Sequence, residues 1–320
     1  MSVKQWCKHT LRRAIGTQAV LDALEPHNGN GHSGSESSQT SMRMAQAAFA
    51  KHEELYARIL DPAVGDDELG FRREDMPCLI ELNGDLLWMP ADLLRYLWHT
   101  RVKEHPLFLL HFLAETLHYQ WIRERLAPGD AALDCGANMG LFSTMMAARV
   151  RPWGSVHAFE PSPGARRDLF RVLKLNQIPG VAVNACALSD ACGEATFCDM
   201  LAGDVRREAS HLNLLDRPNV ANRSEHQMVT VPTRTLDAYV AEKQLVPRLV
   251  KIDVEGAEFL VLEGARQCVA AHKPMLVIEI HPDEQGFFDH GRLKAYLEQY
   301  GYRYEWKEKT YFCDVDGNLM

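Results

Sequence analysis

The run LDCGANMG, residues 133–140, places an acid beside two glycines in a way that suits a bound ligand. An apolar stretch precedes Asp134 and a helical pattern follows the run, which predicts a strand, a tight turn and a helix. A carboxylate at this place would repel a pyrophosphate but attract an ammonium group. We expect the glycines to let the backbone approach the ligand closely. The predicted ligand-binding residues of this turn are Asp134, Gly136, Asn138 and Gly140.

A second acid, Glu160, ends the next apolar stretch in HAFEPS. A carboxylate there can accept hydrogen bonds from both hydroxyls of a ribose. An ammonium group together with a ribose and no phosphate describes S-adenosylmethionine. The alternative ligand, a nicotinamide dinucleotide, requires the pattern G-x-G-x-x-G. The middle glycine of that pattern is missing here, which disfavours an NAD(P)-linked oxidoreductase.

Three further residues at strand ends could take part in chemistry: Asp253 in KIDVEG, and Glu279 and His281 in IEIHP. Period-two alternation places Glu279 and His281 on the same face of their strand. If a hydroxyl is methylated, it must lose a proton, and two interpretations stay open. Either His281 or Asp253 is a general base, or all three hold a divalent cation that lowers the hydroxyl pKa. The metal-free interpretation is favoured, because carboxylates at strand ends are also common hydrogen-bond acceptors.

The elements that must position these residues alternate from residue 130 onward. The expected strands are AALDCG, SVHAFE, VAVNACAL, RLVKIDV and MLVIEI, and the expected helices cover 141–151, 164–176, 256–271 and 288–300. Such alternation predicts an α/β fold with a parallel sheet covered on both faces. The last two strands, YRYEWKE and TYFCDVD, are joined by a short turn at Lys309, which requires antiparallel pairing. The predicted fold is a Rossmann-like, seven-stranded methyltransferase sheet with a C-terminal antiparallel hairpin.

Six blocks in this order carry a resemblance: LDCGANMGLFS, AFEPSP, ALSDACGEATF, RTLDAYV, VKIDVEGAEFLVLEGA and KPMLVIEIHP. Together they resemble the FkbM-type family of S-adenosylmethionine-dependent methyltransferases, over residues 105–315. The resemblance implies O-methylation of a hydroxyl, often on a sugar or a polyketide-like product. The family's cofactor pattern falls on Asp134, Gly136, Asn138, Gly140 and Glu160. The LSD block is placed to cover the adenine with Ser189 and Asp190.

The first 125 residues have a different organisation. Residues 1–41 are expected to form an N-terminal helix and a flexible linker, HNGNGHSGSESSQTS. Residues 42–125 are expected to form a mostly helical α/β extension, with a hairpin over 77–90 around Asn83 and Gly84. The methyltransferase domain is expected over 126–320. The basic N-terminal helix could contact an anionic membrane surface or a partner, although a solvated helix is favoured.

A long polar insertion, residues 200–226, separates the third and fourth expected strands. Loops of this length inside a compact domain are usually functional or disordered. We expect a substrate lid, whose side chains facing an oxygen-rich acceptor are Arg206, Arg207, His211 and Asn213.

Composition limits the function further. A net charge of −8 disfavours a nonspecific nucleic-acid binder. The 8 cysteines form no CxxC pair, so we expect reduced, mostly buried thiols in a cytoplasmic protein. The start is a poor signal peptide, and the longest apolar stretch is too short to cross a bilayer. The expected partner is a small-molecule or glycan acceptor. A cofactor-binding scaffold or regulatory protein without catalysis is a further alternative.

Overall fold

The structure, a computed structural model, describes residues 63–65, 67, 78–82, 85–90, 108–200, 211–212, 226–282, 286–307 and 309–317. The predicted N-terminal helix, the linker and the helical segment over 42–60 lie outside these residues. The chain divides into two compact units. One holds Met1–Leu110 and Lys174–Gln177, and the other holds His111–Leu173 and Ile178–Met320.

The first unit contains the predicted hairpin. Strands β1 (Cys78–Leu82) and β2 (Asp85–Met89) pair antiparallel, with Leu82 opposite Asp85. The Trp88 N–H donates to Asn176 Oδ1, and the Trp88 carbonyl accepts from Asn176 Nδ2, both at 2.8 Å. One buried side-chain amide therefore satisfies both backbone groups of a strand residue, which stabilises the hairpin.

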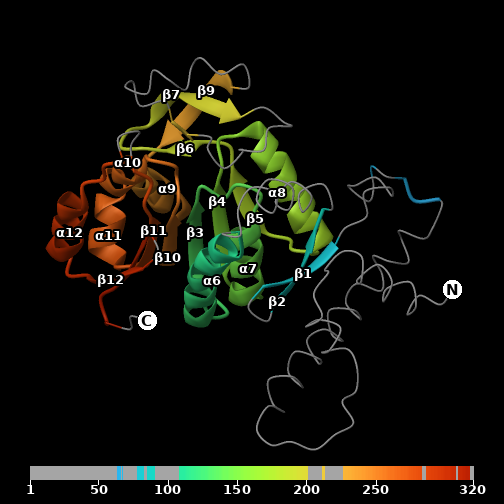
Figure 1. The fold of residues 1–320 in the computed structure, drawn as a ribbon, viewed down its shortest axis with the longest axis horizontal. Helices are drawn as coiled ribbons and strands as arrows, with labels where there is room; N and C mark the ends of the chain where they lie inside the picture. The colour runs from blue at the N-terminus through green and yellow to red at the C-terminus, as the bar shows by residue number, and fades with distance from the viewer. Residues whose placement is uncertain are drawn as a thin grey trace, which may run out of the picture. The chain divides into compact units, whose positions relative to one another are not determined.

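The second unit is built on a seven-stranded sheet in the order β12-β13-β11-β10-β3-β4-β5 (Figure 1). The strands are β3 (Ala131–Cys135), β4 (Ser155–Phe159), β5 (Val181–Asn184), β10 (Pro247–Ile252), β11 (Met275–Glu279), β12 (Arg303–Lys307) and β13 (Thr310–Asp314). The five strands from β11 to β5 are parallel, while β13 runs antiparallel to β11 and to β12. This confirms the predicted fold class, including the C-terminal hairpin.

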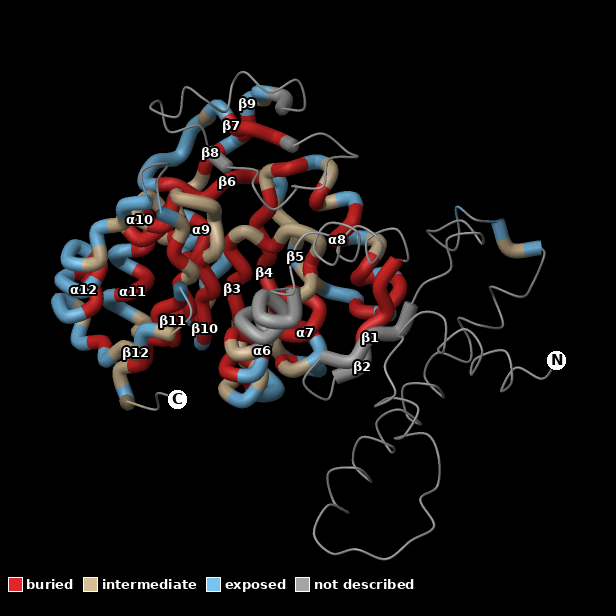
Figure 2. Tube along the Cα trace, in the orientation of Figure 1, coloured by how far each residue is buried: buried red, intermediate tan, exposed pale blue. Residues whose placement is uncertain are grey.

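The centre of this sheet is buried because its strands are apolar almost throughout. Figure 2 shows β3, β4, β10 and β11 as buried chain flanked by helices. The helices are α6 (Phe108–Arg125), α7 (Leu141–Val150), α8 (Pro163–Leu175), α9 (Leu236–Lys243), α10 (Glu258–Glu263), α11 (Arg266–His272) and α12 (His290–Gln299). Among the described helices, none combines the length and the apolar character needed to cross a membrane.

The predicted continuous helix over 256–271 is wrong, because the chain breaks it into α10 and α11 at Gly264. A Cβ added at Gly264 would lie 2.1 Å from the Ser189 carbonyl oxygen, so backbone packs directly against this glycine. The Gly264 carbonyl accepts the N–H of Asp237 instead of continuing a helical ladder. Tertiary packing therefore overrides the helical pattern here.

A second, four-stranded sheet has the order β6-β9-β7-β8 and was not predicted. Its strands are β6 (Ala187–Leu188), β7 (Gly193–Met200), β8 (His211–Leu212) and β9 (His226–Arg234). The expected single strand VAVNACAL is wrong, since it splits into β5 in the main sheet and β6 in this one. The expected insertion over 200–226 begins and ends within strands, and β8 lies inside it. Figure 1 shows β6, β7 and β9 at one end of the main sheet.

The second sheet has its own small core. Ala187, Phe197 and Val231 are buried together with Ala257, and Val254 packs against them. Because residues 254–257 directly follow strand β10, this sheet lies over the carboxyl end of β10. That end is where the predicted catalytic residues are found.

Candidate active site

The predicted strand, turn and helix around residue 136 are present. The turn between β3 and α7 has positive φ angles at Gly136 (80°), Asn138 (48°) and Gly140 (84°). The N–H groups of Gly136 and Ala137 both donate to the Phe159 carbonyl at 3.0 Å. The turn is therefore fixed against the end of the neighbouring strand β4.

The two glycines have a packing role that the sequence did not predict. A Cβ at Gly136 would lie 1.7 Å from the Asp253 carbonyl oxygen, and one at Gly140 would lie 2.8 Å from Leu169 Cγ. The missing side chains thus make room for the protein itself. The glycines allow the turn to pack against β10 and α8 while its backbone is left-handed. The approach of a ligand to these glycines stays a prediction.

Glu160 follows β4 and connects the turn to the next loop. Its Oε2 accepts the Asn138 N–H and its Oε1 accepts the Ser162 N–H, both at 2.8 Å. Burial raises the pKa of Glu160 to about 7, against the lowering effect of these two hydrogen bonds. Each oxygen keeps a lone pair, so the carboxylate can still accept from two ligand hydroxyls.

Asp134 has protein partners that the sequence did not predict. Its side chain is 0% exposed, Ser143 Oγ donates to Oδ2 at 2.6 Å, and Lys251 Nζ lies 3.3 Å from Oδ1. The positive group beside Asp134 is therefore a lysine of the chain, where the sequence predicts a ligand ammonium. The contact of Asp134 with a ligand ammonium stays a prediction.

Lys251 joins the two parts of the site. Its ammonium lies 3.1 Å from Asp253 Oδ2 and donates to the Gly136 carbonyl at 3.2 Å. Burial lowers the pKa of Lys251, but Asp253 and Asp134 more than offset this, so the pKa is raised and the group stays protonated. The sequence carried a signal for it: a lysine within the apolar run LVKI, two residues before Asp253 and so on the same face.

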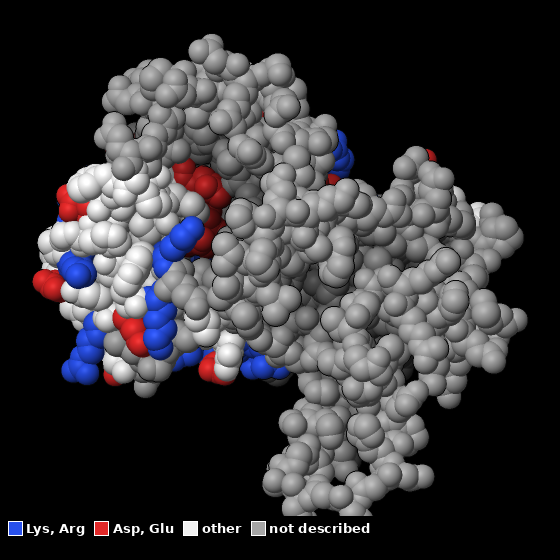
Figure 3. Space-filling model, in the orientation of Figure 1, with Lys and Arg blue, Asp and Glu red and all other residues white. Residues whose placement is uncertain are grey.

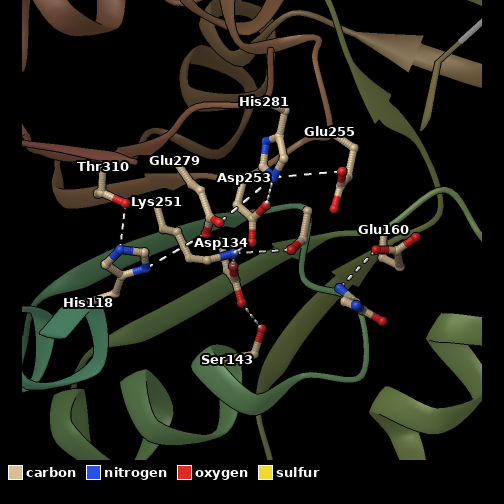
Figure 4. A network of polar contacts seen from close by, with 12 residues as sticks. His118, Asp134, Ser143, Glu160, Lys251, Asp253, Glu255, Glu279, His281 and Thr310 are labelled. Atoms are coloured by element: carbon tan, nitrogen blue, oxygen red, sulfur yellow. Dashed lines mark hydrogen bonds and ion pairs between the residues drawn. The ribbon is translucent and has the colours of Figure 1, made fainter. Parts of the chain in front are cut away.

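The predicted catalytic residues lie together around His281 (Figure 4). His281 Nε2 is 3.8 Å from Asp253 Oδ1, 3.7 Å from Glu255 Oε2 and 3.8 Å from Glu279 Oε1. On the other side of the ring, Nδ1 is 2.9 Å from Glu258 Oε1. The carboxyl ends of β10 and β11 therefore bring Asp253, Glu279 and His281 into one cluster, as their positions predicted.

The charges of this cluster differ from those of isolated side chains. Burial lowers the pKa of His281, but Glu258, Glu255 and Asp253 raise it to about 10. Burial raises the pKa of Asp253, but Lys251 and His281 bring it below its ordinary value. At neutral pH Asp253 is an anion and His281 already carries two ring protons. Of the two predicted bases, Asp253 is the one free to accept a proton.

Glu255 is a carboxyl of the cluster whose ionisation its surroundings oppose. Burial raises its pKa to about 8, and the nearby charges of Asp253 and Glu279 add to the effect. Its backbone has a φ of 52°, a left-handed conformation uncommon outside glycine. Figure 3 shows acidic side chains gathered in a hollow of the face drawn.

A buried histidine from α6 borders the cluster and was missed from the sequence. One ring nitrogen of His118 hydrogen-bonds Thr310 Oγ1, and the other lies 3.8 Å from Glu279 Oε2. Burial lowers the pKa of His118 to about 4, so the ring is neutral. No sequence pattern links residue 118 to residues 279 and 310, because only the fold makes them neighbours.

A metal was not the favoured interpretation, and the geometry gives the cluster other sources of positive charge. One atom each from Asp253, Glu255 and His281 lie within 4.8 Å of one another, a spacing that a divalent cation could bridge. Lys251 pairs with Asp253, and Glu258 contacts only Nδ1 of His281. The metal-free interpretation stays a prediction.

Two further predicted residues, Ser189 and Asp190, follow β6 of the second sheet. Ser189, at the end of β6, donates its N–H to the Arg234 carbonyl and its hydroxyl to Asp190, which is exposed. Their role over an adenine stays a prediction. Arg206, Arg207 and Asn213 lie outside the described residues. His211 is in β8 opposite Cys198, but its side chain is not described.

Known proteins resemble this chain over the same region. The family model described as the methyltransferase FkbM domain matches residues 134–304. Methyltransferase 1 of Beauveria bassiana is 30% identical over 148 residues, which are 43% of this chain and 59% of that protein. The 31-O-demethyl-FK506 methyltransferase FkbM of Streptomyces tacrolimicus is 29% identical over 202 residues, covering 55% of this chain and 74% of that one.

Among solved structures, methyltransferase FkbM from Methylobacillus flagellatus KT aligns with a TM-score of 0.38 and 16% identity. The alignment covers 70% of this chain and 58% of that one.

Proposed function

The chain belongs to the FkbM methyltransferase family, and on this premise we propose that it is an S-adenosylmethionine-dependent O-methyltransferase. The proposed acceptor is a hydroxyl of a sugar, glycolipid or polyketide-like molecule. The observation that carries the proposal is the place of Asp253: directly after β10 its carboxylate pairs with Lys251, and its backbone packs against Gly136 in the turn that follows β3. The similar Streptomyces protein is named for methylation at an oxygen, which agrees with this choice.

The residues present suit the proposed cofactor. Glu160 offers a carboxylate to a ribose, as described above. The carboxylates of Asp134, Asp253, Glu258 and Glu279 outnumber the cations of Lys251 and His281. An excess of negative charge favours a sulfonium ligand and disfavours a pyrophosphate, which supports methyl transfer over the oxidoreductase alternative.

When bound, S-adenosylmethionine supplies an electrophilic methyl group on a positively charged sulfur. The chain's task is to orient the acceptor and to take up its proton, and well-held reactants can gain about 7–11 kcal/mol from orientation alone. Lys251 holds Oδ2 of Asp253, and Oδ1 points towards His281. We assign proton uptake to Asp253 Oδ1. The surrounding carboxylates also stabilise the positive charge that grows on the acceptor oxygen during attack.

The proposed acceptor is a small molecule or glycan rather than a nucleic acid, in keeping with the net charge of −8. We also propose a cytoplasmic location. The six cysteines whose side chains the structure describes are free thiols, and only Cys192 among them is exposed, as expected of a reducing compartment.

Labelled methyl transfer tests the proposed function. The 320-residue chain is incubated with radiolabelled S-adenosylmethionine and fractions of a cell extract, and the labelled product is identified by mass spectrometry. We expect a methyl ether on a small molecule or glycan. A methylated nitrogen or carbon would refute O-methylation. Calorimetry with S-adenosylhomocysteine and with NADH separates the oxidoreductase alternative. Tight binding without any labelled product would favour the scaffold alternative.

A further inference from the structure

We infer that Glu258 is a positioning residue, which fixes the His281 ring so that Nε2 faces the acceptor hydroxyl beside Asp253. This inference rests on the proposed function and adds a residue to it. From the sequence alone Glu258 has no defined role, because an acid at the start of a helix is commonly there for the helix dipole.

The contacts of Glu258 are those of a buried orienting group. It is the first residue of α10 and is 1% exposed. Its Oε1 accepts the Gly256 N–H at 2.9 Å and lies 2.9 Å from His281 Nδ1. Because a carboxylate only accepts hydrogen bonds, Nδ1 must carry the proton in this contact. The ring is thereby fixed in one orientation, and the turn after β10 is tied to the end of β11.

The opposite ring nitrogen, Nε2, faces the side of the cluster where we place the acceptor hydroxyl. Nε2 lies 3.7–3.8 Å from oxygens of Asp253, Glu255 and Glu279. These distances exceed a hydrogen bond, for which about 2.7–3.2 Å is usual. An oxygen placed within hydrogen-bond reach of both Nε2 and Asp253 Oδ1 would complete a triangle with them. A hydroxyl there accepts the Nε2 proton in a hydrogen bond and donates its own to Asp253.

The resulting step is balanced. The acceptor oxygen forms a bond to the methyl carbon as the bond from that carbon to sulfur breaks, and its electron pair stays on sulfur. The hydroxyl proton passes to Asp253 Oδ1, and His281 keeps both of its protons throughout. Glu258 touches none of the reacting atoms, so it acts through His281. In metal sites and in catalytic triads, a carboxylate likewise orients a histidine towards the group on which that histidine acts.

The test compares Glu258→Ala, Glu258→Gln and Glu258→Asp with a control from the same helix. The control is Glu263→Gln, the last residue of α10, whose carboxylate pairs at the surface with Arg266 and Arg292. The readouts are nitrogen NMR of ¹⁵N-histidine-labelled protein, affinity for S-adenosylhomocysteine and melting temperature. The fourth readout is kcat of methyl transfer to the acceptor that the labelling experiment identifies.

We expect Glu258→Ala to lower kcat about 10–100-fold, the range for loss of a carboxylate that orients a histidine, with affinity for S-adenosylhomocysteine within about threefold of the unaltered chain. The Nδ1 resonance of His281 should lose its hydrogen-bonded shift. The pH midpoint of the ring should fall, because Asp253, Glu255 and Glu279 remain but the nearest anion is gone. Glu258→Gln should keep the fold and lose part of kcat, Glu258→Asp should retain more, and Glu263→Gln should change none of these.

The inference is overturned if the His281 resonances and midpoint are unchanged in Glu258→Ala. It is also overturned if kcat falls only in proportion to a loss of melting temperature or cofactor affinity in all three variants. If the unaltered chain methylates no hydroxyl, the proposed function fails. The NMR comparison still decides separately whether Glu258 positions His281.

Discussion

The carboxylate of Asp253 has a different neighbour at each oxygen, and this decides how the residue can act. Lys251 lies 3.1 Å from Oδ2, while His281 Nε2 lies 3.8 Å from Oδ1. The first contact is a buried ion pair that fixes the side chain, and the second leaves room for a ligand atom. A proton acceptor needs a fixed orientation and a lone pair that the donor can approach.

Replacing Asp253 by Asn should remove the proton acceptor and keep the side-chain shape. We expect kcat to fall about 10²–10⁴-fold, with affinity for S-adenosylhomocysteine changed far less. Steady-state kinetics and calorimetry measure the two effects. A matched control is Asp237→Asn, in α9, whose carboxylate accepts backbone N–H groups of residues 267 and 268. Equal losses of kcat in both variants would argue against a chemical role for Asp253.

The pH dependence of kcat separates the two predicted bases. The pKa of Asp253 is below its ordinary value, so it is ionised throughout the neutral range. We therefore expect kcat to stay nearly constant between about pH 6 and 8. If His281 were the base, only its neutral form would work. Because its pKa is about 10, kcat would then rise about tenfold per pH unit across this range. A pH–rate profile gives the answer directly.

Glu160 should control cofactor affinity, because its carboxylate is buried beside the turn. Glu160→Gln removes a charged acceptor, and hydrogen bonds to charged groups are worth about 1.5–3 kcal/mol. We expect affinity for S-adenosylhomocysteine to fall at least tenfold, measured by calorimetry. Glu194→Gln, at an exposed position of β7, is the control. A Glu160 variant with unaltered affinity would contradict the assignment.

The same residue predicts how cofactor affinity depends on pH. Burial raises the pKa of Glu160 to about 7 in the ligand-free protein. The ionised form is the one that accepts hydrogen bonds from two ribose hydroxyls, and the protonated form offers a weaker acceptor. Affinity should therefore weaken as pH falls below about 7 and level off above it. Calorimetry from pH 5.5 to 8.5 measures this, and Glu160→Gln should abolish the slope.

At the scale of elements, the close approach of the turn after β3 to the end of β10 is what makes one site from two strands. Gly136 allows it, because a side chain there would overlap the Asp253 carbonyl. The second sheet adds a cover: its core includes Ala257, and Ser162, next to the Glu160 loop, donates to Asp199 of β7 at 2.6 Å. The turn after β3, the turn after β10 and the second sheet are thus linked by direct packing and hydrogen bonds.

Alanine substitutions at two glycines with nearly the same φ angle distinguish the cost of a left-handed backbone from the cost of steric overlap. Gly136 has a φ of +80° and Gly180 a φ of +84°, but only Gly136 has an atom where a Cβ would lie. Gly180→Ala should cost about 1–2 kcal/mol, the price of a left-handed residue. Gly136→Ala should cost more than about 4 kcal/mol, in the range of severe substitutions. Urea denaturation of both variants measures the free energies of unfolding, and equal losses would contradict the close approach.

At the scale of the whole molecule, the charges of the site come from elements far apart in the chain. Lys251 from β10 supplies positive charge to carboxylates of β3 and the turn after β10, and His281 does so from the end of β11. The site thus has internal counter-ions. This arrangement lowers the electrostatic need for a divalent cation.

Treatment of the protein with a chelator should therefore leave methyl transfer unchanged. The assay compares chelated protein, untreated protein and chelated protein supplied with Mg²⁺ or Mn²⁺. A loss of about tenfold or more that either ion restores would show a metal in the reaction. It would also mean that Lys251 and His281 are insufficient counter-ions for the cluster.

The sequence by itself determined the features that depend on local patterns. Apolar alternation and turn residues identified the parallel strands, the hairpin around Lys309 and the strand–turn–helix at Asp134. Since parallel strands end at one edge of a sheet, Glu160, Asp253, Glu279 and His281 could be placed at one site without coordinates. These inferences hold because secondary structure and the positions of strand ends depend on residues that are contiguous in the chain.

The tertiary structure alone decided which groups neutralise one another. It paired Asp134 with Lys251 through the register of β3 and β10, brought His118 to Thr310, and placed Glu258 behind His281. It also divided the expected third strand between two sheets and broke the helix at Gly264. The physical reason is that burial and electrostatic pairing depend on distances between residues far apart in the chain. Those distances are set by packing of whole elements, which no local pattern specifies.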